Sequence, residues 1–383
     1  MPSQTTQAAA HRTLVLRLLR KHGPLTRGEL APLCGLSRTV LHDTVGALMD
    51  SGTVRASVPE AARRKRGRPA EVLAVNPGTG LLLGIEFARR AVRVATMDTA
   101  HGIVGALAEA HGPDTPWQTR VDTAWRLADT LTSGTLRSAA PNGIGVGVAG
   151  PVSQVGAVDP VSPLELTGPQ PPTHNPLPAL VRERFGAPML IDSNARLAAL
   201  AESIWGAAAG RHDVLYVRLS YGVDGGLVVA GALHRGGHGR SAEVGHITVE
   251  PGGAPCECGG TGCLQTVASL EAVLAAYRAA GGTAADVPEL LAALRSGNRT
   301  AHAVLEQVGA HVGRALDAVS HAVGPDMIVI GGELADAGAP LIGSIERTLN
   351  TRTVHGIAGR PLVRPSRLGD AATAFGAIAQ LMP

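Results

Sequence analysis

The chain has 383 residues, of which 45% are hydrophobic and 17% charged, and this composition excludes an intrinsically disordered protein. The 34 Lys and Arg residues and 31 Asp and Glu residues leave a net charge of only +3. That charge is unevenly distributed: residues 1–75 hold 12 basic and 5 acidic side chains (+7), and the other 308 residues hold 22 and 26 (−4). A basic N-terminal region joined to a mildly acidic remainder (residues 76–383, called the body below) is typical of a nucleic-acid-binding module joined to a second unit.

The cysteine content and hydropathy of the chain predict where the protein works. Four cysteines are too few for the disulfide framework of a small secreted protein. The N-terminus lacks the charged-then-apolar pattern of a signal peptide, and no apolar run approaches the roughly 20 residues of a membrane span. We therefore expect a cytoplasmic protein with reduced thiols and no membrane partner.

Three helices are predicted within the first 51 residues. The first covers residues 11–22 and ends at Gly23. The second begins at Thr26, which forms a capping box with Glu29, and ends at Gly35. The third has Ser37 as its N-cap and ends at residues 51–52. The positions expected to be buried are Leu30 and Leu33 in the second helix, and Val40, Leu41, Val45, Leu48 and Met49 in the third.

Two strand-like runs follow, over residues 53–58 and 71–75, on either side of a basic loop at 59–70. Helices around a glycine turn followed by such a hairpin predict a winged helix-turn-helix DNA-binding domain over residues 1–76. The start of the third helix would meet base edges in the major groove, and the basic loop would contact phosphates. The predicted DNA-binding residues are Ser37, Arg38, Thr39 and His42 in the helix, and Arg63, Arg64, Lys65, Arg66 and Arg68 in the loop.

Each part of that prediction has a plainer alternative. A charged run such as residues 63–68 is often only a solvated loop, and three short helices can form a small bundle for protein contacts. The direct succession of the glycine-turned helices and the basic loop favours DNA binding over both.

From residue 81 onward, short apolar runs alternate with Ala-rich helical stretches, which predicts an α/β fold. Residues 76–78 are the expected linker. The strand candidates are Leu82–Met97, Gly143–Ala149, Met189–Ile191, Leu215–Leu219, Leu227–Val229 and Met327–Ile330. The helix candidates are Gln118–Ser133, Leu177–Phe185, Arg196–Gly206, Leu270–Ala279, Val287–Ser296 and His302–Val323.

Three thiols and one imidazole lie within eighteen residues of each other: His246, Cys256, Cys258 and Cys263. This set satisfies a closed, tetrahedral zinc site, and the glycines at 259, 260 and 262 allow the chain to curl around it. No open coordination position is left, so we expect structural zinc. The alternative is a redox pair or a set of unrelated buried thiols. Cys34 is expected to be a small core residue.

The motifs of the chain, from the basic loop onward, resemble those of the ROK family (repressors, open reading frames and sugar kinases), in its winged-helix repressor branch. The motifs that carry this resemblance are Gly67-Arg68-Pro69, Gly84-Ile85-Glu86, Gly145–Pro151, Leu190–Glu202, Gly225-Gly226, Gly231, Glu243–His246 with Cys256–Cys263, and Ile330-Gly331-Gly332. The resemblance implies an actin/hexokinase-like ROK domain at residues 77–383. Its two α/β lobes would cover approximately 77–190 and 191–383, with a sugar-binding cleft between them.

Two departures from the family pattern argue against catalysis. Asn194 stands where the sugar kinases have the Asp that acts as base, and a carboxamide cannot accept the hydroxyl proton. The phosphate-binding turn, normally Asp-x-Gly-x-Thr, reads Glu86-Phe87-Ala88-Arg89-Arg90. Asp192 lies two residues before Asn194 and is expected to point elsewhere. We therefore predict no ATP-dependent kinase activity.

The resemblance also implies which residues would bind a sugar. These are Glu243 and His246 of the Glu-x-Gly-His motif, Asn194 at the base position, and Gln265, which replaces a family Glu. His246 would then use one ring nitrogen for zinc and the other for the ligand or its neighbour. The alternative is a degenerate pocket in which Glu243 pairs only locally.

The leading hypothesis is a transcriptional regulator, most specifically a repressor of carbohydrate-related genes. It would bind double-stranded DNA at a palindromic operator as a homodimer or homotetramer and respond to a sugar or sugar derivative. The first alternative is an ATP-dependent sugar kinase with an N-terminal DNA-binding module. The second is a DNA-binding protein that responds to no ligand.

Overall fold

The computed structural model describes residues 11–12, 14–16, 18–19, 22–50, 53–57, 71–75, 80–98, 102–137, 140–150, 152, 176–349 and 360–382. The predicted basic loop with Arg63, Arg64, Lys65, Arg66 and Arg68, and the linker at 76–78, lie outside the described residues.

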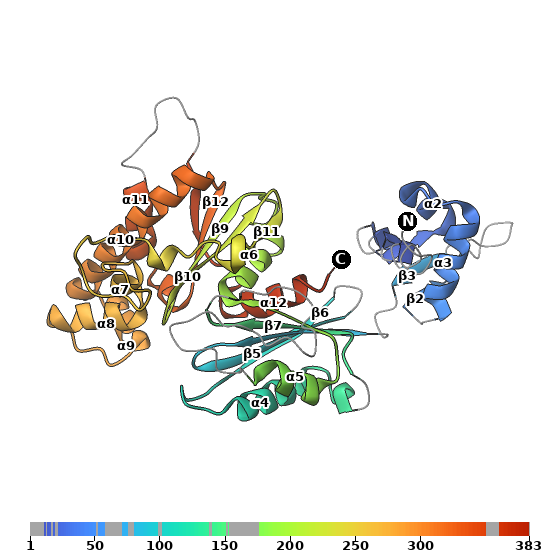
Figure 1. Cartoon of the computed structure of the whole chain (residues 1–383), viewed down its shortest axis with the longest axis horizontal. Coiled ribbons are helices and arrows are strands. Elements are labelled where there is room, and N and C mark those ends of the chain that lie inside the picture. The colour runs from blue at the N-terminus through green and yellow to red at the C-terminus, as the bar shows by residue number, and fades with distance from the viewer. Residues whose placement is uncertain are drawn as a thin grey trace.

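The N-terminal region is built from short helices and a small antiparallel sheet (Figure 1). The described residues from 11 to 22 are helical, and α2 (Arg27–Cys34) and α3 (Arg38–Asp50) follow. The sheet has the order β1-β3-β2, formed by β1 (Leu25–Thr26), β2 (Val54–Ser57) and β3 (Val72–Val75). The sequence did not predict β1, whose two residues pair with β3.

The local signals for α2 and α3 are confirmed. The Thr26 hydroxyl accepts a hydrogen bond from the Glu29 amide (3.2 Å), and the Glu29 carboxylate accepts one from the Thr26 amide (2.8 Å). Gly35 ends α2 in the left-handed conformation, with φ of 62°. One expected core position is wrong, because Leu33 is 45% exposed. Cys34, beside it in α2, is the residue that points into the core.

The first lobe contains a five-stranded sheet of order β6-β5-β4-β7-β8, in which β4, β7 and β8 pair in parallel and β5 pairs antiparallel with both β4 and β6. Its strands are β4 (Leu81–Phe87), β5 (Ala91–Asp98), β6 (Ile103–Ala110), β7 (Gly143–Val148) and β8 (Met189–Ser193). Helices α4 (Trp117–Leu131) and α5 (Leu177–Phe185) cover one face and share a core with β4 and β7. The 3-10 turn η3 (Thr135–Arg137) follows α4.

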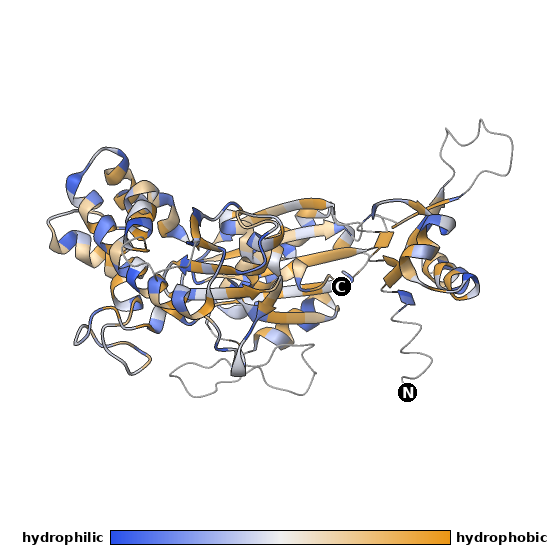
Figure 2. Cartoon of the chain, turned by 90° about the horizontal axis from the view of Figure 1, so that it is seen from above, coloured by the Kyte–Doolittle hydropathy of each residue, from blue (hydrophilic) through white to orange (hydrophobic). Residues whose placement is uncertain are grey.

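The second lobe contains another five-stranded sheet, of order β11-β10-β9-β12-β13. Its strands are β9 (Val214–Leu219), β10 (Val223–Val229), β11 (Ala232–His234), β12 (Met327–Gly331) and β13 (Leu362–Pro365). Its outer helices are α7 (Gln265–Ala268), α8 (Leu270–Ala279), α9 (Val287–Arg295), α10 (Arg299–Val323) and α11 (Ala339–Leu349). The 3-10 turns of this lobe are η4 (Gly237–Gly239), η5 (Val244–His246) and η6 (Glu333–Ala337), whereas η7 (Gly369–Ala371) packs on β5 of the first lobe. Figure 2 shows hydrophobic residues concentrated along the strands of both lobes.

Two helices, α6 (Asn194–Ile204) and α12 (Ala372–Ala379), pack together between the two sheets. Helix α6 lies on β9 and β10, and α12 lies on β4 and β7. Glycines permit this close packing: a Cβ on Gly145 would lie 1.8 Å from the Ala377 carbonyl oxygen. Because α12 packs on the sheet of the first lobe, a lobe boundary at residue 190 does not describe the last residues of the chain.

The sequence located long elements better than short or uniformly apolar ones. Helices α5 and α8 have the predicted bounds. The single strand candidate Leu82–Met97 is in fact the hairpin of β4 and β5, and β6, β11, β13, α7, α11 and α12 were missed. Within the described part of the chain, we find no helix with the length and apolarity that a membrane crossing requires.

Candidate functional site

The predicted metal ligands converge. The ligand atoms of His246, Cys256, Cys258 and Cys263 all lie within 4.8 Å of one another, and none of the thiols is in a disulfide. Cys258 Sγ lies 3.7 Å from Cys263 Sγ, and Cys256 Sγ lies 3.5 Å from His246 Nδ1. Tetrahedral zinc with Zn–S bonds of about 2.3 Å places sulfurs about 3.8 Å apart. The donor set and its spacing therefore fit a metal ion of this kind.

The loop around this cluster depends on glycine. Gly262 has a φ of 66°, and a Cβ there would lie 1.7 Å from the Glu250 carbonyl oxygen. The Gly260 amide lowers the pKa of the Cys258 thiol by hydrogen bonding, whereas burial raises the pKa of Cys263 to about 12. A divalent cation would deprotonate both thiols, since metal ligation requires the thiolate.

Asn194, the residue at the predicted base position, opens α6 and is 5% exposed. Its backbone carbonyl accepts a hydrogen bond from the Thr373 hydroxyl (3.2 Å). Its side-chain Oδ1 is buried and has no hydrogen-bond partner among the described residues. Buried polar atoms in proteins are nearly always paired, so this oxygen is available to a donor from a ligand or from water.

Two half-buried carboxylates lie near the metal cluster. Burial raises the pKa of Glu243, and the nearby Asp224 raises it further, while His246 and Arg196 oppose the shift. Burial also raises the pKa of Asp224, and Arg218 and His246 oppose that shift. Neither carboxylate accepts a hydrogen bond from the described residues. His246 turns Nδ1 toward Cys256 Sγ (3.5 Å), so Nδ1 is the ring nitrogen that lies with the thiols.

Gln265 is engaged by neighbouring groups of the protein. Its amide nitrogen donates to Glu257 Oε1 (2.6 Å), and its oxygen accepts from the Val223 amide (3.4 Å). It thereby ties the cysteine loop to β10. Two of the four predicted sugar ligands, Asn194 and Gln265, carry a side-chain amide. The amide of Gln265 has protein partners on both its nitrogen and its oxygen.

A pocket of about 550 Å³ lies beside Glu243, between strands β9 and β10 and the last turns of α10. Its lining is mainly apolar and includes Leu215, Leu227, Val319 and Val323. Glu243 is the one predicted sugar ligand that lines this pocket, whereas Asn194, His246 and Gln265 do not line it.

Asp192 is fully buried and is held by two arginines. Its Oδ1 lies 2.5 Å from the Arg196 guanidinium and accepts from the Ser193 amide (2.7 Å), and its Oδ2 accepts from Arg235 Nε (2.9 Å). We call these residues, Asp192, Arg196 and Arg235, the Asp192 network. The sequence expectation that Asp192 is directed elsewhere agrees with these contacts, because both carboxylate oxygens are occupied.

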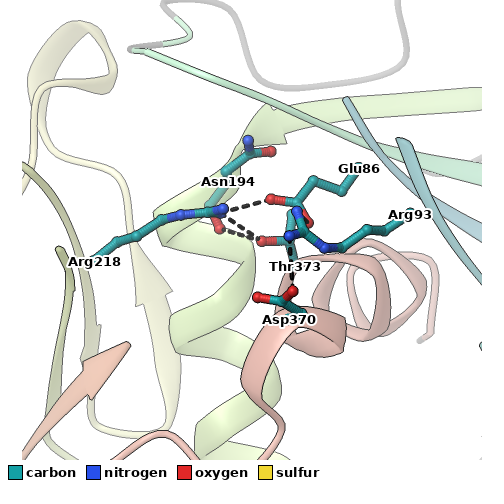
Figure 3. Close-up of polar contacts among 6 residues, drawn as sticks. All are labelled: Glu86, Arg93, Asn194, Arg218, Asp370 and Thr373. Atoms are coloured by element: carbon teal, nitrogen blue, oxygen red, sulfur yellow. Dashed lines mark hydrogen bonds and ion pairs between the residues drawn. The ribbon is translucent and has the colours of Figure 1, made fainter. Parts of the chain in front are cut away.

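Glu86 is also fully buried and is held by two arginines (Figure 3). Arg218 of β9 lies 2.6 Å from Glu86 Oε1, and Arg93 of β5 lies 3.2 Å from Oε2 and 2.9 Å from Asp370. We call Glu86, Arg93, Arg218 and Asp370 the Glu86 network. Burial alone would lower the pKa of Arg218, but the attractions of Glu86, Tyr216 and Glu333 together outweigh it and raise that pKa. The network links the sheet of the first lobe to that of the second.

Figure 3 relates the Glu86 network to Asn194. Arg218 Nη1 lies 3.3 Å from the Thr373 hydroxyl, which in turn donates to the Asn194 carbonyl. The carboxamide of Asn194 points away from these groups. The backbone of Asn194 is therefore fixed by the network while its side chain stays available.

The turn expected to be a degraded phosphate-binding turn faces the second lobe. The guanidinium carbons of Arg89 and Arg90 each lie 5.4 Å from the centre of the Tyr221 ring, a cation–π geometry. Arg89 also lies 3.7 Å from Glu271 of α8. Side chains of the protein thus occupy the space between this turn and the turn that joins β9 to β10.

The predicted base-reading residues lie where DNA could reach them. Ser37, Arg38, Thr39 and His42 are all exposed on the first turns of α3, and the His42 side chain is 76% exposed. Ser37 acts as the expected N-cap, since its hydroxyl lies 3.4 Å from the Val40 amide and its carbonyl accepts from Leu41.

Sequence reasoning missed Arg196, Arg218, Arg235 and Asp224. The sequence did hold a signal for Arg218 and for its partner Glu86: Arg218 stands in the apolar strand Val214–Leu219, and Glu86 stands in the apolar strand Leu81–Phe87. A charge on a strand buried on both faces needs an opposite charge beside it. The pairing of Glu86 with Arg218 crosses 132 residues, so the sequence could indicate that partners exist without identifying them.

Comparison with known proteins gives consistent matches. The sequence profile of the ROK family matches residues 83–382. The DNA-binding transcriptional dual regulator NagC of Escherichia coli K12 is 28% identical over 378 residues, which is 95% of this chain and 90% of that protein. A glucokinase of Halalkalibacterium halodurans is 34% identical over 219 residues, covering 52% of this chain and 66% of the kinase.

A solved structure matches nearly the whole chain. The crystal structure of a ROK family transcriptional regulator, a homologue of the E. coli MLC protein, aligns with a TM-score of 0.78 and 22% identity. The alignment covers 99% of this chain and 97% of that one. It therefore extends beyond the two lobes into the N-terminal region and supports the ROK fold.

Proposed function

Because the chain belongs to the ROK family, we propose that it is a DNA-binding transcriptional regulator, most specifically a repressor of carbohydrate-related genes. One observation carries the proposal: a chain that matches a DNA-binding regulator over nearly its full length has an exposed helix start at Arg38, Thr39 and His42. In this proposal, residues 1–76 form a winged helix-turn-helix domain that binds DNA. Residues 77–383 form the ROK domain that senses the ligand.

The DNA-binding step rests on charge and on helix α3. The net charge of +7 on residues 1–75 attracts phosphate, and α3 presents its first turns to base edges. A palindromic operator requires two such domains, so the protein acts as a homodimer or homotetramer. Sugar binding would change how the lobes close and thereby the separation of the two DNA-binding domains.

The test is selection of genomic fragments by the purified protein, followed by fluorescence anisotropy. We expect sub-micromolar binding that weakens steeply with salt. Arg38→Ala should weaken binding, and the matched control Arg295→Ala, on α9 of the body, should not. Failure of every fragment to bind at sub-micromolar concentration in moderate salt would rule out the proposal.

The metal in this proposal is a structural zinc ion held by His246, Cys256, Cys258 and Cys263, and it folds the loop that follows η5. Elemental analysis should find about one zinc per chain. Cys258→Ser should lose it, whereas Cys34→Ser, which changes a buried thiol of the N-terminal region, should retain it. A stably folded wild-type protein without any metal would contradict the structural role.

The sugar in this proposal is held by Asn194, Glu243 and His246, with Gln265 at the edge of the site. Hydroxyl groups donate hydrogen bonds, and the unpaired Asn194 Oδ1 and the two half-buried carboxylates Glu243 and Asp224 are acceptors. Calorimetry with D-glucose, D-xylose and N-acetyl-D-glucosamine tests this step. A ligand-independent DNA-binding protein would give no heat with any sugar.

We further propose that the protein is not an enzyme. Asn194 offers no group that can take the hydroxyl proton, and Arg89, Arg90 and Tyr221 occupy the place of the phosphate-binding turn. The alternative, an ATP-dependent sugar kinase, draws support from the glucokinase match. Sugar-dependent formation of ADP from ATP by the purified protein would establish the kinase and overturn this part of the proposal.

A further inference from the structure

The side chain of Arg196 is buried in the first turn of α6, only 2% exposed, and every nitrogen of its guanidinium can be accounted for. One edge meets Asp192 at 2.5 Å, Nη1 donates to the Gly239 carbonyl (2.5 Å), and Nη2 donates to the Val152 carbonyl (3.1 Å). A planar guanidinium can join three acceptors in this way, whereas the single ammonium of lysine cannot match its geometry.

The three acceptors belong to three different segments. Asp192 is the next-to-last residue of β8, the strand that leads into α6, Val152 follows β7, and Gly239 lies in η4 of the second lobe. The junction is tight: Gly239 has a φ of 68°, and a Cβ there would lie 2.1 Å from the Val152 carbonyl oxygen. Arg196 therefore fixes these segments against one another and is not simply a buried charge.

The loop attached in this way carries a predicted sugar ligand. Residues 235–243 are fastened twice, by Arg235 to Asp192 (2.9 Å) and by Gly239 to Arg196, and the loop ends at Glu243. Asn194 lies two residues before Arg196 in the same helical turn. One guanidinium thus sets the position of Glu243 relative to Asn194.

We infer that Arg196 is a positioning residue for the ligand site: through Asp192 and Gly239 it holds loop 235–243 so that Glu243 and Asn194 face the same ligand. The inference rests on the proposed function for the identity of the ligand as a sugar. It does not require Arg196 to touch that sugar.

Two measurements on the full-length, zinc-loaded protein test it. The first uses no ligand: trypsin should cut after Arg235 or Arg240 faster in Arg196→Met than in the wild type, relative to cleavage elsewhere. The matched control is Arg93→Met, which removes another buried arginine from the body but does not touch this loop. Equal cleavage of the loop in the two variants would overturn the inference.

The second measurement is calorimetry with D-glucose, D-xylose and N-acetyl-D-glucosamine. For a sugar that the wild type binds, Arg196→Met should lose about 10–100-fold in affinity, the same range as when a residue that orients a metal ligand is removed. Arg196→Lys should not restore it. Arg235→Gln, a milder change at a side chain that is 34% exposed, should lose less. Unchanged affinity in Arg196→Met would overturn the inference.

The sugar-sensing function and the positioning role of Arg196 are contradicted by different results. If the wild type binds none of the three sugars, the sugar-sensing function loses its support, and the protease experiment alone then decides whether Arg196 holds the loop. Zinc content and DNA affinity should remain those of the wild type in every variant, and a loss of both would show a general folding defect. In that case Arg235→Gln decides the inference.

Discussion

The Asp192 network and the Glu86 network both centre on a carboxylate and two arginines, but the arginines of the two networks differ in their exposure and in their other hydrogen-bond partners. Each has one fully buried carboxylate between two arginines. In the Glu86 network both arginines are largely buried, with side chains 10% and 12% exposed, and they come from the two different sheets. In the Asp192 network, Arg196 also bonds two backbone carbonyls, and Arg235 is one-third exposed. The first arrangement joins lobes, and the second attaches a loop.

This difference in surroundings should decide what each network contributes. Removing one partner of a buried pair is costly because the other charge stays buried. Arg235 can turn toward water if Asp192 loses its charge, and Arg196 keeps its two carbonyls. Arg218 is largely buried; besides Glu86 it hydrogen-bonds the Thr373 hydroxyl, and Glu333 is a further carboxylate that attracts it. We therefore expect stability to depend mostly on Glu86 and ligand binding mostly on Asp192.

The largest expected effect is that of Glu86→Gln, which leaves two buried guanidinium groups without their shared carboxylate. It should lower the free energy of unfolding by about 3–5 kcal/mol. Urea unfolding followed by tryptophan fluorescence measures this in the body alone, because Trp117, Trp125 and Trp205 all lie outside residues 1–75.

The matched control is Glu109→Gln, which breaks the exposed pair of Glu109 with Arg126 (2.6 Å). A surface pair of this kind contributes no more than about 1 kcal/mol. Equal losses in Glu86→Gln and Glu109→Gln would mean that the Glu86 network does not hold the lobes together.

A smaller loss of stability is expected for Asp192→Asn. Arg196 keeps its two backbone carbonyls and Arg235 can turn toward water, so the cost should be about 1–3 kcal/mol, that of weakening hydrogen bonds to a charged group. The same urea experiment measures it. If Asp192→Asn destabilises the body more than Glu86→Gln does, the expectation that stability depends mostly on Glu86 is wrong. The attachment of loop 235–243 would then contribute more to folding than the contact between the lobes.

The smallest expected effect lies outside both networks, at His311 of α10. His311 is 6% exposed and lies 2.6 Å from Arg314 and 3.4 Å from Glu250. Burial lowers its pKa below the usual 6.5, and Arg314 adds to the shift while Glu250 opposes it. Below pH 6.5 the unfolded chain therefore takes up a proton before the folded protein does, and stability falls as the pH falls through this window.

His311→Gln cannot take up that proton and should make the stability less dependent on pH below 6.5. The measurement is the difference in urea midpoint between pH 7.5 and pH 5.5, in the variant and in the wild type. An identical pH dependence in the two proteins would show that His311 titrates alike in the folded and unfolded states.

Much of this architecture follows from local sequence signals, and the failures have physical causes. Helices α5 and α8 and the capping box at Thr26 are determined within a few residues. Helix α12 was missed because it is buried along its whole length, so it has no polar face to give a helical period. Strand β6 was missed for the opposite reason: its pattern is mostly exposed on both faces, so no alternation marks it.

The candidate site divides in the same way. The cysteine and histidine ligands lie within eighteen residues, and their spacing alone predicted a cluster that the structure brings together. The pairing of Glu86 with Arg218 and of Arg196 with Gly239 depends on how distant segments fold. Sequence could predict an unfit catalytic base at Asn194, but not the arginine that fixes the loop opposite it.

The return of α12 to the first lobe has a consequence for biosynthesis. The backbone of α12 packs directly on Gly84 of β4 and Gly145 of β7. A side chain at either glycine would collide with the backbone of α12. On the ribosome, residues 81–193 emerge long before residues 372–379, so one face of the first sheet stays uncovered while about half the chain is made. Domains generally fold as they emerge, but this one must wait for its last helix, and nascent chains shortened before residue 372 should be those that chaperones retain.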